Sequence, residues 1–213
     1  MTEPANDLDA LTRRLRAGDA EAAGELFAAY GERLKRMVRL RLDRRLQGRL
    51  DASDVLQEAY LDVRHKAADF AAKGMSAYVW LRLIVAERLL ILHRHHLGTQ
   101  MRDAAQEVSL GRGGPPAATT HSLANLLLGR LTSPTQAAIR AERQARLQEA
   151  LNGMDALDRE VLALRHFEEL SNQEAAAVLG LSKSATSNRY VRALTRLQAT
   201  LEGIPGFLDK HRG

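Results

Sequence analysis

Eight polar side chains that could bind nucleic acid lie close together near the C-terminal end of the sequence. They are Lys183, Ser184, Thr186, Ser187, Asn188, Arg189, Arg192 and Arg196. Hydroxyl, amide and cationic groups of this kind bind base edges and phosphates. Apolar residues recur in the same stretch at spacings of three and four, namely Val191, Leu194, Leu197 and Leu201. That period predicts a helix with one buried apolar face.

The segment before these residues predicts a second, shorter helix. Ser171 and Glu174 have the spacing of a capping box, in which each side chain binds a free backbone N–H of the other residue. Gly180 can adopt the left-handed conformation that ends this helix, and Ser182 can cap the next one. Two helices joined in this way predict a helix-turn-helix, whose second helix enters the major groove of DNA. The same pattern also fits an ordinary helical hairpin with a solvated polar face.

A second polar group is acidic and lies in the N-terminal half. Asp54, Gln57 and Glu58 are spaced i, i+3 and i+4, so they share one exposed side of a predicted helix. The preceding segment, residues 33–49, is rich in arginine. It fits either a solvated basic helix end or a surface for nucleic acid or an acidic partner. An acidic patch directly after it is unusual for a protein that binds only DNA, and favours docking on a basic protein surface.

Residues 78–96 have the apolar periodicity of a strong helix, and residues 64–76 before them read as a loop in which Phe70 could act as an anchor. Three histidines near the helix end suggest a metal site: His93, His95 and His96. However, residues one and two apart on a helix do not converge on one ion, and no nearby carboxylate pair completes a ligand set. We therefore expect no metal, and favour phosphate or base contact from this basic helix end.

Composition restricts the class of protein. Strand signals are nearly absent, while Ala, Leu, Arg and Glu recur with helical periodicity, so we expect an all-α protein. A formal charge of +5 favours a polyanionic partner. The lack of cysteine excludes disulfides, thiol nucleophiles and cysteine zinc sites. Because we find neither a signal peptide nor a run of about eighteen apolar residues, we expect no membrane association and a cytoplasmic location.

We expect two helical domains joined by a flexible linker. The boundaries are residues 7–97 for the first domain, 98–132 for the linker and 133–203 for the second domain. The linker assignment rests on residues 111–120, where Gly, Pro and Thr follow no periodic pattern. The linker also contains a short predicted helix whose leucines we expect to dock between the domains: Leu123, Leu126 and Leu127.

In their order along the chain, these parts resemble the extracytoplasmic-function (ECF) group of sigma-70-type RNA polymerase sigma factors. Residues 8–97 resemble region 2 of that family, and residues 134–201 resemble region 4. The matching motifs are Asp51–Glu58 for region 2.2, Trp80–Ile84 for the opening of the helix that faces the promoter −10 element, Leu157–Phe167 for the start of region 4, and Arg189 with Arg192–Leu194 for the recognition helix that faces the −35 element.

The resemblance implies a protein without enzyme activity or cofactor that binds RNA polymerase core and directs promoter recognition and transcription initiation. Region 2.2 of the family docks on the β′ clamp helices, which assigns Asp54, Gln57 and Glu58 to polymerase binding. The other implied partners are the β flap of polymerase, promoter DNA and an anti-sigma factor. The implied −10 contacts are Phe70, as a stacking surface for unpaired bases, with Arg82, Arg88, Arg94 and His95. The eight polar residues between positions 183 and 196 would bind the −35 element.

The resemblance does not extend to the base preference at the −35 element. Residues 184–188 read S-A-T-S-N where the family commonly has G-T-V-K-S, and Glu87 stands where asparagine is frequent in the −10 helix. Two other functions remain open. A helix-turn-helix regulator that acts without polymerase core leaves the acidic group unexplained, and a histidine-dependent nuclease lacks an Asp/Glu/His constellation at usable spacing.

Overall fold

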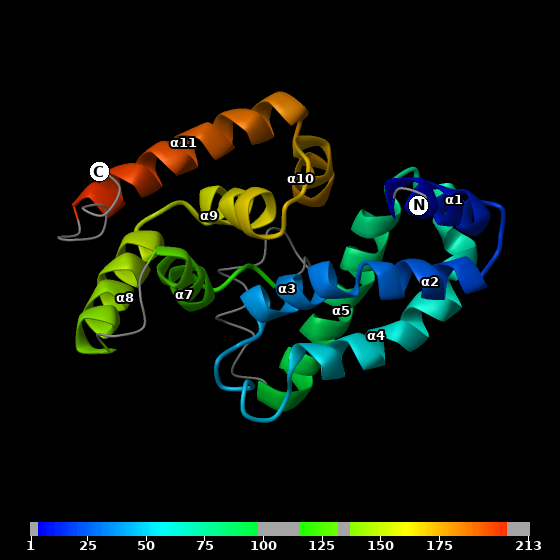
Figure 1. Ribbon diagram of the computed structural model, residues 1–213, viewed down its shortest axis with the longest axis horizontal. Helices are drawn as coiled ribbons and strands as arrows, with labels where there is room; N and C mark the ends of the chain where they lie inside the picture. Colours follow the sequence, from blue (N-terminus) through cyan, green and yellow to red (C-terminus); the bar gives the residue numbers. More distant parts are fainter. Residues whose placement is uncertain (1–3, 98–115, 132–136, 204–213) are drawn as a thin grey trace. The chain divides into compact units, whose positions relative to one another are not determined.

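The structure, a computed structural model, describes residues 4–97, 116–131 and 137–203 of the 213-residue chain. The chain divides into two compact units, one up to Pro116 and the other from Ala117 onward. Helices account for most of the described residues, and no strand occurs among them (Figure 1). The predicted all-α fold is therefore confirmed.

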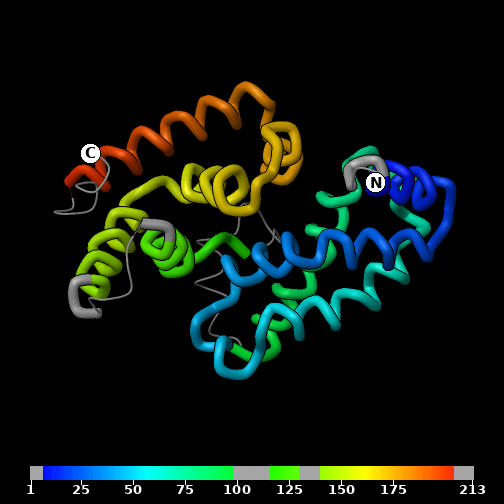
Figure 2. Tube along the Cα trace, viewed as in Figure 1, coloured from blue at the N-terminus to red at the C-terminus, as the bar shows by residue number. Residues whose placement is uncertain are grey.

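The N-terminal unit consists of helices packed around one apolar core. Its elements are α1 (Pro4–Arg16), α2 (Glu21–Ala29), α3 (Gly31–Arg41), α4 (Ala52–Lys66), the short 3-10 helix η1 (Ala67–Lys73) and α5 (Ala77–Leu97). Fully buried side chains from four different helices meet in the core, among them Leu26, Leu34, Val55 and Val85. α4 packs along α5 and also contacts α2 and α3 (Figure 2). One side of α4 is therefore covered, and its other side is left to solvent.

Local interactions determine where α4 begins and how it is held. Its N-cap, Asp51, accepts hydrogen bonds from the backbone N–H groups of Ser53 and Asp54, and Asp54 Oδ2 accepts one from the N–H of Asp51 at 2.8 Å. This reciprocal capping satisfies N–H groups that have no partner inside the helix. Further along, the Arg88 guanidinium of α5 binds the Asp62 carboxylate with Nη2–Oδ2 and Nε–Oδ2 distances of 2.6 and 2.8 Å. Such two-point pairing fixes the position of α4 against α5.

The C-terminal unit is a second helical bundle. Its elements are α7 (Thr120–Leu131), α8 (Ala137–Asn152), α9 (Ala156–Leu162), the π-helical turn η2 (Ala163–Phe167), α10 (Asn172–Leu179) and α11 (Lys183–Glu202). α7, which belongs to the expected linker, packs against α8 inside this unit (Figure 2). Leu123 and Leu127 are buried there, whereas Leu126 is exposed. The described contacts of the short leucine-rich helix are thus contacts within the C-terminal unit.

The predicted helix-turn-helix is present. Ser171 Oγ accepts a hydrogen bond from the N–H of Glu174, and Glu174 Oε2 accepts one from the N–H of Ser171. Gly180 ends α10 with a φ of 64°, a left-handed conformation that glycine adopts without steric cost. Ser182 then caps α11 by accepting from the N–H of Ala185 at 3.1 Å. The helix boundaries expected from the capping pattern are confirmed.

Candidate functional site

The acidic side of α4 faces solvent. Asp54, Gln57 and Glu58 are all exposed, while the residues between them, such as Val55, point into the core. Glu58 Oε2 lies 3.8 Å from Arg88 Nη1, so one edge of this surface is also tied to α5. The capping bond from Asp54 keeps its carboxylate at the start of the helix. The three residues thus form a polar surface on a helix whose orientation is fixed.

Two apolar features lie next to this acidic surface. Leu61, one turn after Gln57, is 61% exposed, which is unusual for a large apolar side chain. A shallow groove beside the same helix is lined by Phe27, Lys35, Ser53, Leu56, Gln57 and Tyr60. A partner that binds the acidic side chains would therefore also meet apolar surface, as a typical protein interface requires.

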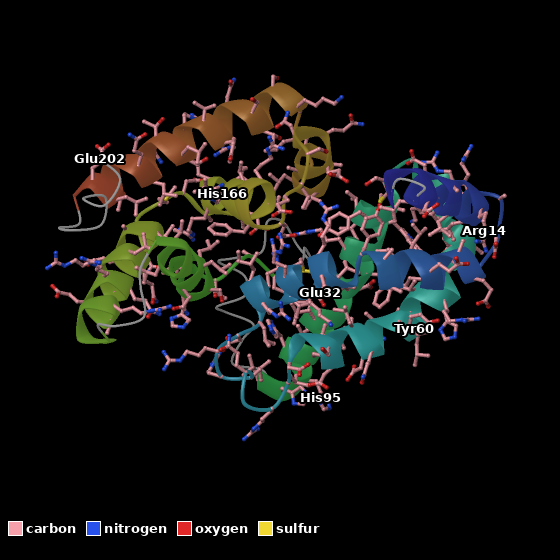
Figure 3. The ribbon with its side chains drawn as sticks, in the orientation of Figure 1. Arg14, Glu32, Tyr60, His95, His166 and Glu202 are labelled. Carbon is pink, nitrogen blue, oxygen red and sulfur yellow. The ribbon has the colours of Figure 1, made fainter. Side chains whose placement is uncertain are left out.

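The residues predicted for the −10 element do not lie on one surface. The Phe70 ring is buried at 1% exposure and packs on Trp80 with the ring centroids 5.1 Å apart. Arg82 is fully buried within the N-terminal unit. The prediction that these two side chains are available to DNA is wrong for this structure, because both are buried inside the N-terminal unit. The exposed members of the set are Arg94 and His95 at the C-terminal end of α5; Figure 3 labels His95.

Arg88, another residue of the predicted −10 set, is only partly exposed to solvent. Its side chain is about one quarter exposed, and its guanidinium is bound to the Asp62 carboxylate. A group held in this way stabilises the contact between α4 and α5. Its availability for DNA would require that the ion pair opens.

The three histidines of α5 point into different environments. His93 is buried, and its Nε2 accepts a hydrogen bond from the backbone N–H of Asp43 at 3.3 Å. Burial lowers the pKa of His93, and the nearby Asp43 carboxylate only partly opposes this effect. His95 and His96 are exposed and pack edge to face. Within the residues that the structure describes, no group of three or more His, Cys, Asp or Glu side chains is arranged to hold a metal ion.

The predicted −35 residues divide into an exposed group and a buried group. Those exposed on α11 are Lys183, Ser184, Ser187, Asn188, Arg192 and Arg196. Thr186 is fully buried, and its hydroxyl donates to the carbonyl oxygen of Ser182 at 3.0 Å. The prediction of a DNA contact from Thr186 is therefore wrong, because this residue lies on the side of α11 that faces the rest of the unit.

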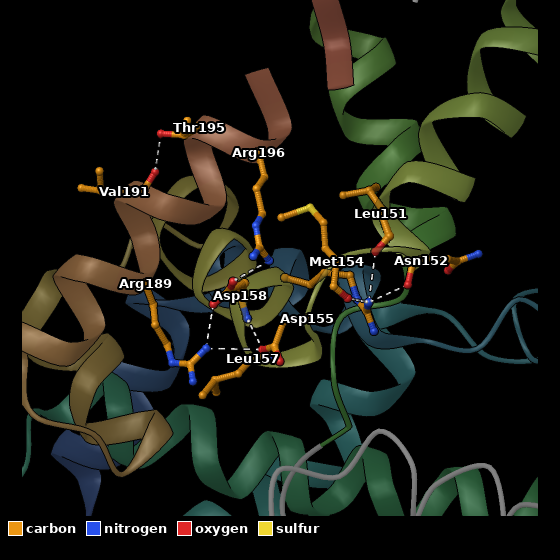
Figure 4. A network of polar contacts seen from close by, with 11 residues as sticks. Leu151, Asn152, Met154, Asp155, Leu157, Asp158, Arg189, Val191, Thr195 and Arg196 are labelled. Atoms are coloured by element: carbon orange, nitrogen blue, oxygen red, sulfur yellow. Dashed lines mark hydrogen bonds and ion pairs between the residues drawn. The ribbon is translucent and has the colours of Figure 1, made fainter. Parts of the chain in front are cut away.

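Arg189 is also directed away from the exposed side of α11. Its Nη1 donates to Asp158 Oδ1 of α9 at 2.7 Å and lies 3.4 Å from Asp155 Oδ1 (Figure 4). Arg196 Nη1 lies 3.5 Å from the other carboxylate oxygen of Asp158. Asp158 is almost completely buried, so its charge requires these cationic partners. Contrary to the prediction, Arg189 joins α11 to α9 in this structure.

Sequence reasoning missed two residues of this region. No short-range pattern indicates that Asp158 is buried, and the apolar spacing places Val191 in the buried stripe of its helix. Val191 is instead 59% exposed. The signal was its spacing, because it lies three residues after Asn188 and seven after Ser184, on the polar side of the helix.

Comparisons with known proteins agree on one family. Residues 144–197 match the family described as sigma-70, region 4. The chain is 26% identical over 204 residues to the RNA polymerase sigma factor NccH of Alcaligenes xylosoxydans xylosoxydans, which covers 95% of this chain and 98% of NccH. Its fold is similar to that of CnrH in a solved complex with the cytosolic domain of CnrY, with a TM-score of 0.51, 24% identity, and coverage of 91% of this chain and 96% of that chain.

No helix in the described part of the chain has the length and hydropathy needed to cross a membrane.

The ECF RNA polymerase sigma factor SigD of Mycobacterium tuberculosis (strain ATCC 25618 / H37Rv) is 30% identical over 198 residues, which cover 93% of this chain and 85% of SigD. With a similarity of this extent, the chain belongs to the ECF RNA polymerase sigma factors, which bind RNA polymerase core and direct promoter recognition and transcription initiation.

Proposed function

We propose that this sigma factor docks on RNA polymerase core through the acidic side of α4 and binds the −35 element through the exposed side of α11. The docking residues are Asp54, Gln57 and Glu58, and their partner on polymerase is the pair of β′ clamp helices. The −35 residues are Lys183, Ser184, Ser187, Asn188, Arg192 and Arg196. Arg94 and His95 contribute to binding at the −10 element, and the C-terminal unit also contacts the β flap.

The exposure and rigidity of α4 support the docking assignment. Its three polar residues point to solvent on one side, and Asp62 and Lys66 bind Arg88 and Glu87 of α5 on another. A surface that is already ordered loses little conformational entropy when a partner binds. Its negative charge favours a basic partner surface and disfavours direct contact with DNA phosphates.

The chemistry of α11 supports the DNA assignment. Cationic Lys183 and Arg192 are exposed at either end of a stretch of small hydroxyl and amide side chains. The cations can bind phosphates, which fix the position of the helix, while the shorter side chains can reach base edges. Replacing Arg192 with alanine should weaken binding to all sequences alike, because phosphate contacts are independent of sequence.

The location and regulation of the protein follow from the same proposal. RNA polymerase acts in the cytoplasm, so we place the chain there. CnrH of Cupriavidus metallidurans, which is 28% identical over 194 residues, has been solved with the cytosolic domain of CnrY. We therefore include a regulatory protein, an anti-sigma factor, among the partners of this chain.

The docking assignment can be tested with the double variant Gln57→Ala/Glu58→Ala. Loss of an acid and an amide at the centre of the docking surface should reduce binding to core polymerase at least tenfold, since truncation of a central interface residue costs about 2 kcal/mol or more. The measurement is co-purification of the full-length chain with core polymerase, followed by titration of initiation. Circular dichroism of the free variant verifies that it is folded.

The chain contains a matched control for this experiment. Gln148 and Glu149 form the same dipeptide on α8, where Glu149 is exposed. The variant Gln148→Ala/Glu149→Ala should bind core polymerase like the unaltered chain. Undiminished co-purification of Gln57→Ala/Glu58→Ala would refute the docking assignment and show that the chain binds core polymerase through another surface.

A further inference from the structure

The exposed side of α11 has an uncharged centre. Ser184, Ser187, Asn188, Val191 and Thr195 recur at spacings of three and four, so they form one strip along the helix. All five are exposed. Thr195 donates its hydroxyl to the carbonyl oxygen of Val191 at 3.1 Å, which binds that hydroxyl to its own helix. What the strip offers to a partner is therefore hydroxyls, one amide and branched methyl groups.

Two arginines of α11 are directed away from this strip, whereas Arg192 is exposed at its edge. Arg189 and Arg196 extend toward Asp158 of α9, while Val191 points away from that cluster (Figure 4). The Asp158 carboxylate is almost completely buried, so the ion pair with Arg189 at 2.7 Å keeps this guanidinium at α9. Arg189 is thus held away from the strip, and the cations exposed at its edges are Lys183 and Arg192.

Val191 is the unusual member of the strip. It is one of four large apolar side chains that are exposed in the described part of the chain, together with Leu61, Ile91 and Leu126. The methyl groups of this valine, which lies near Asn188 and Arg192, form no hydrogen bonds with water. They can instead be buried against an apolar group in the major groove. The C5-methyl group of thymine is the apolar group that this groove presents.

Asn188, one turn before Val191, carries an amide that can bind adenine, the base that pairs with thymine. A side-chain amide can donate to adenine N7 and accept from the adenine N6 amino group at the same time. Arginine and lysine, the usual ligands of guanine O6 and N7, are not among the five residues of the strip, although Lys183 and Arg192 are exposed at its edges. The amide of Asn188 and the exposed methyl groups of Val191 are therefore chemically suited to an A·T pair.

We propose that α11 reads an A·T base pair within the −35 element. The Asn188 amide binds adenine, and the methyl groups of Val191 contact the C5-methyl of a thymine in the same pair or in the adjacent one. This inference rests on the proposed binding of α11 to the −35 element and adds the base preference of that helix. The similarity to the family does not give this preference, because residues 184–188 read S-A-T-S-N and differ from the common family motif.

The test uses the full-length chain assembled with core polymerase. Promoters are first selected from a library randomised in the −35 region, and each thymine of the selected element is then replaced by uracil, which lacks the C5-methyl group. At one position this replacement should weaken open-complex formation about fourfold, the effect expected for one methyl group removed from an apolar contact. The variant Val191→Ala should be insensitive to the replacement at that position. Asn188→Ala should reduce the preference for adenine at the same or adjacent pair about tenfold.

Leu126→Ala serves as the matched control, because Leu126 is also an exposed apolar residue of the C-terminal unit but lies on α7. This variant should retain the full sensitivity to uracil. Initiation that is indifferent to uracil at every −35 position, a Val191→Ala variant that keeps the sensitivity, or a selected element made only of G·C pairs would each overturn the inference while the sigma function stands. Failure to initiate from any library member with core polymerase would overturn the proposed function, and the inference with it.

Discussion

At the scale of single residues, Glu169 is the residue whose backbone most constrains the DNA-binding region. Its φ is 58°, in the left-handed region that side chains with a Cβ seldom adopt. It lies between the π-helical turn η2 and Ser171, the N-cap of α10. The chain must reverse direction there within a few residues, and the left-handed conformation at Glu169 makes this reversal possible. The first helix of the helix-turn-helix depends on it.

We therefore predict opposite effects of glycine at two glutamates. Glu169→Gly should be more stable than Glu169→Ala by about 1 kcal/mol, because glycine adopts a positive φ without steric cost and alanine does not. In the last turn of α8, Glu149→Gly should be less stable than Glu149→Ala by up to about 1 kcal/mol. The measurement is the urea midpoint of the four variants, read by circular dichroism. Equal stability of the two Glu169 variants would show that the backbone there relaxes.

At the scale of elements, α9 positions α11. The helix begins at its N-cap Asp155, whose side chain accepts from the N–H groups of Leu157 and Asp158. Arg159 of the same helix donates to the carbonyl oxygens of Leu151 and Asn152 at the end of α8, and to that of Met154 just after it. One short helix thus binds carbonyl groups at the end of α8 and, through Asp158, fixes the orientation of α11.

We predict that Asp158→Asn destabilises the C-terminal unit by about 2 kcal/mol. The expected value lies between the effect of an exposed ion pair and that of a fully buried one, since Arg189 keeps some contact with solvent while Asp158 has almost none. Asp155→Asn is the control and should change stability by less than about 1 kcal/mol, because asparagine is an equally good N-cap. Chemical denaturation of the full-length variants measures both. Similar small effects for the two would argue against Asp158 as the residue that holds α11.

The segment that joins α4 to α5 has more helical structure than its sequence predicts. Residues 64–76 were expected to form a loop, but α4 continues to Lys66 and η1 spans Ala67–Lys73. Phe70 is buried from this 3-10 helix, with the Arg16 guanidinium 5.7 Å from the centre of its ring. The segment thus closes the apolar core of the N-terminal unit. This closure removes Phe70 from the surface where unpaired bases could stack.

At the scale of the whole molecule, the two proposed surfaces belong to different units. The acidic side of α4 lies in the unit that ends at Pro116, and α11 lies in the unit that begins at Ala117. α7 belongs to the second unit, where Ala118 donates its N–H to the buried Glu160 carboxylate at 3.0 Å. The C-terminal unit therefore contains more than the residues that match the region 4 family, because residues 117–131 contribute to its core.

We predict that Leu128→Ala affects only the C-terminal unit. Leu128 is fully buried in α7, so its truncation should cost about 2–5 kcal/mol. Hydrogen exchange should accelerate in α8 and leave α4 and α5 unchanged, since the two units have separate cores. Leu126→Ala, at an exposed position of the same helix, should cost less than about 1 kcal/mol. Faster exchange throughout the N-terminal unit would contradict the independence of the two cores.

Much of the helical architecture could be predicted from sequence alone. Short-range rules locate the capping box at Ser171 and Glu174, the left-handed Gly180 and the cap at Ser182, because each depends only on residues within one turn. The position of Asp54, Gln57 and Glu58 on one shared side of α4 follows from helical spacing in the same way. The grouping of these acidic and amide residues and the helix-turn-helix were therefore predictable from the sequence alone.

Only the tertiary structure decided which side of each helix is covered. Helical spacing groups residues by face, but a neighbouring element determines whether that face is reached by solvent. The contact of η1 with α5 buries Phe70, and Asp158 of α9 draws Arg189 away from the side of α11 where Val191 is exposed. These contacts join residues 10 to 31 positions apart in the chain, which no local pattern encodes. Periodicity thus determined the candidate surfaces, and long-range packing selected the side chains that those surfaces present.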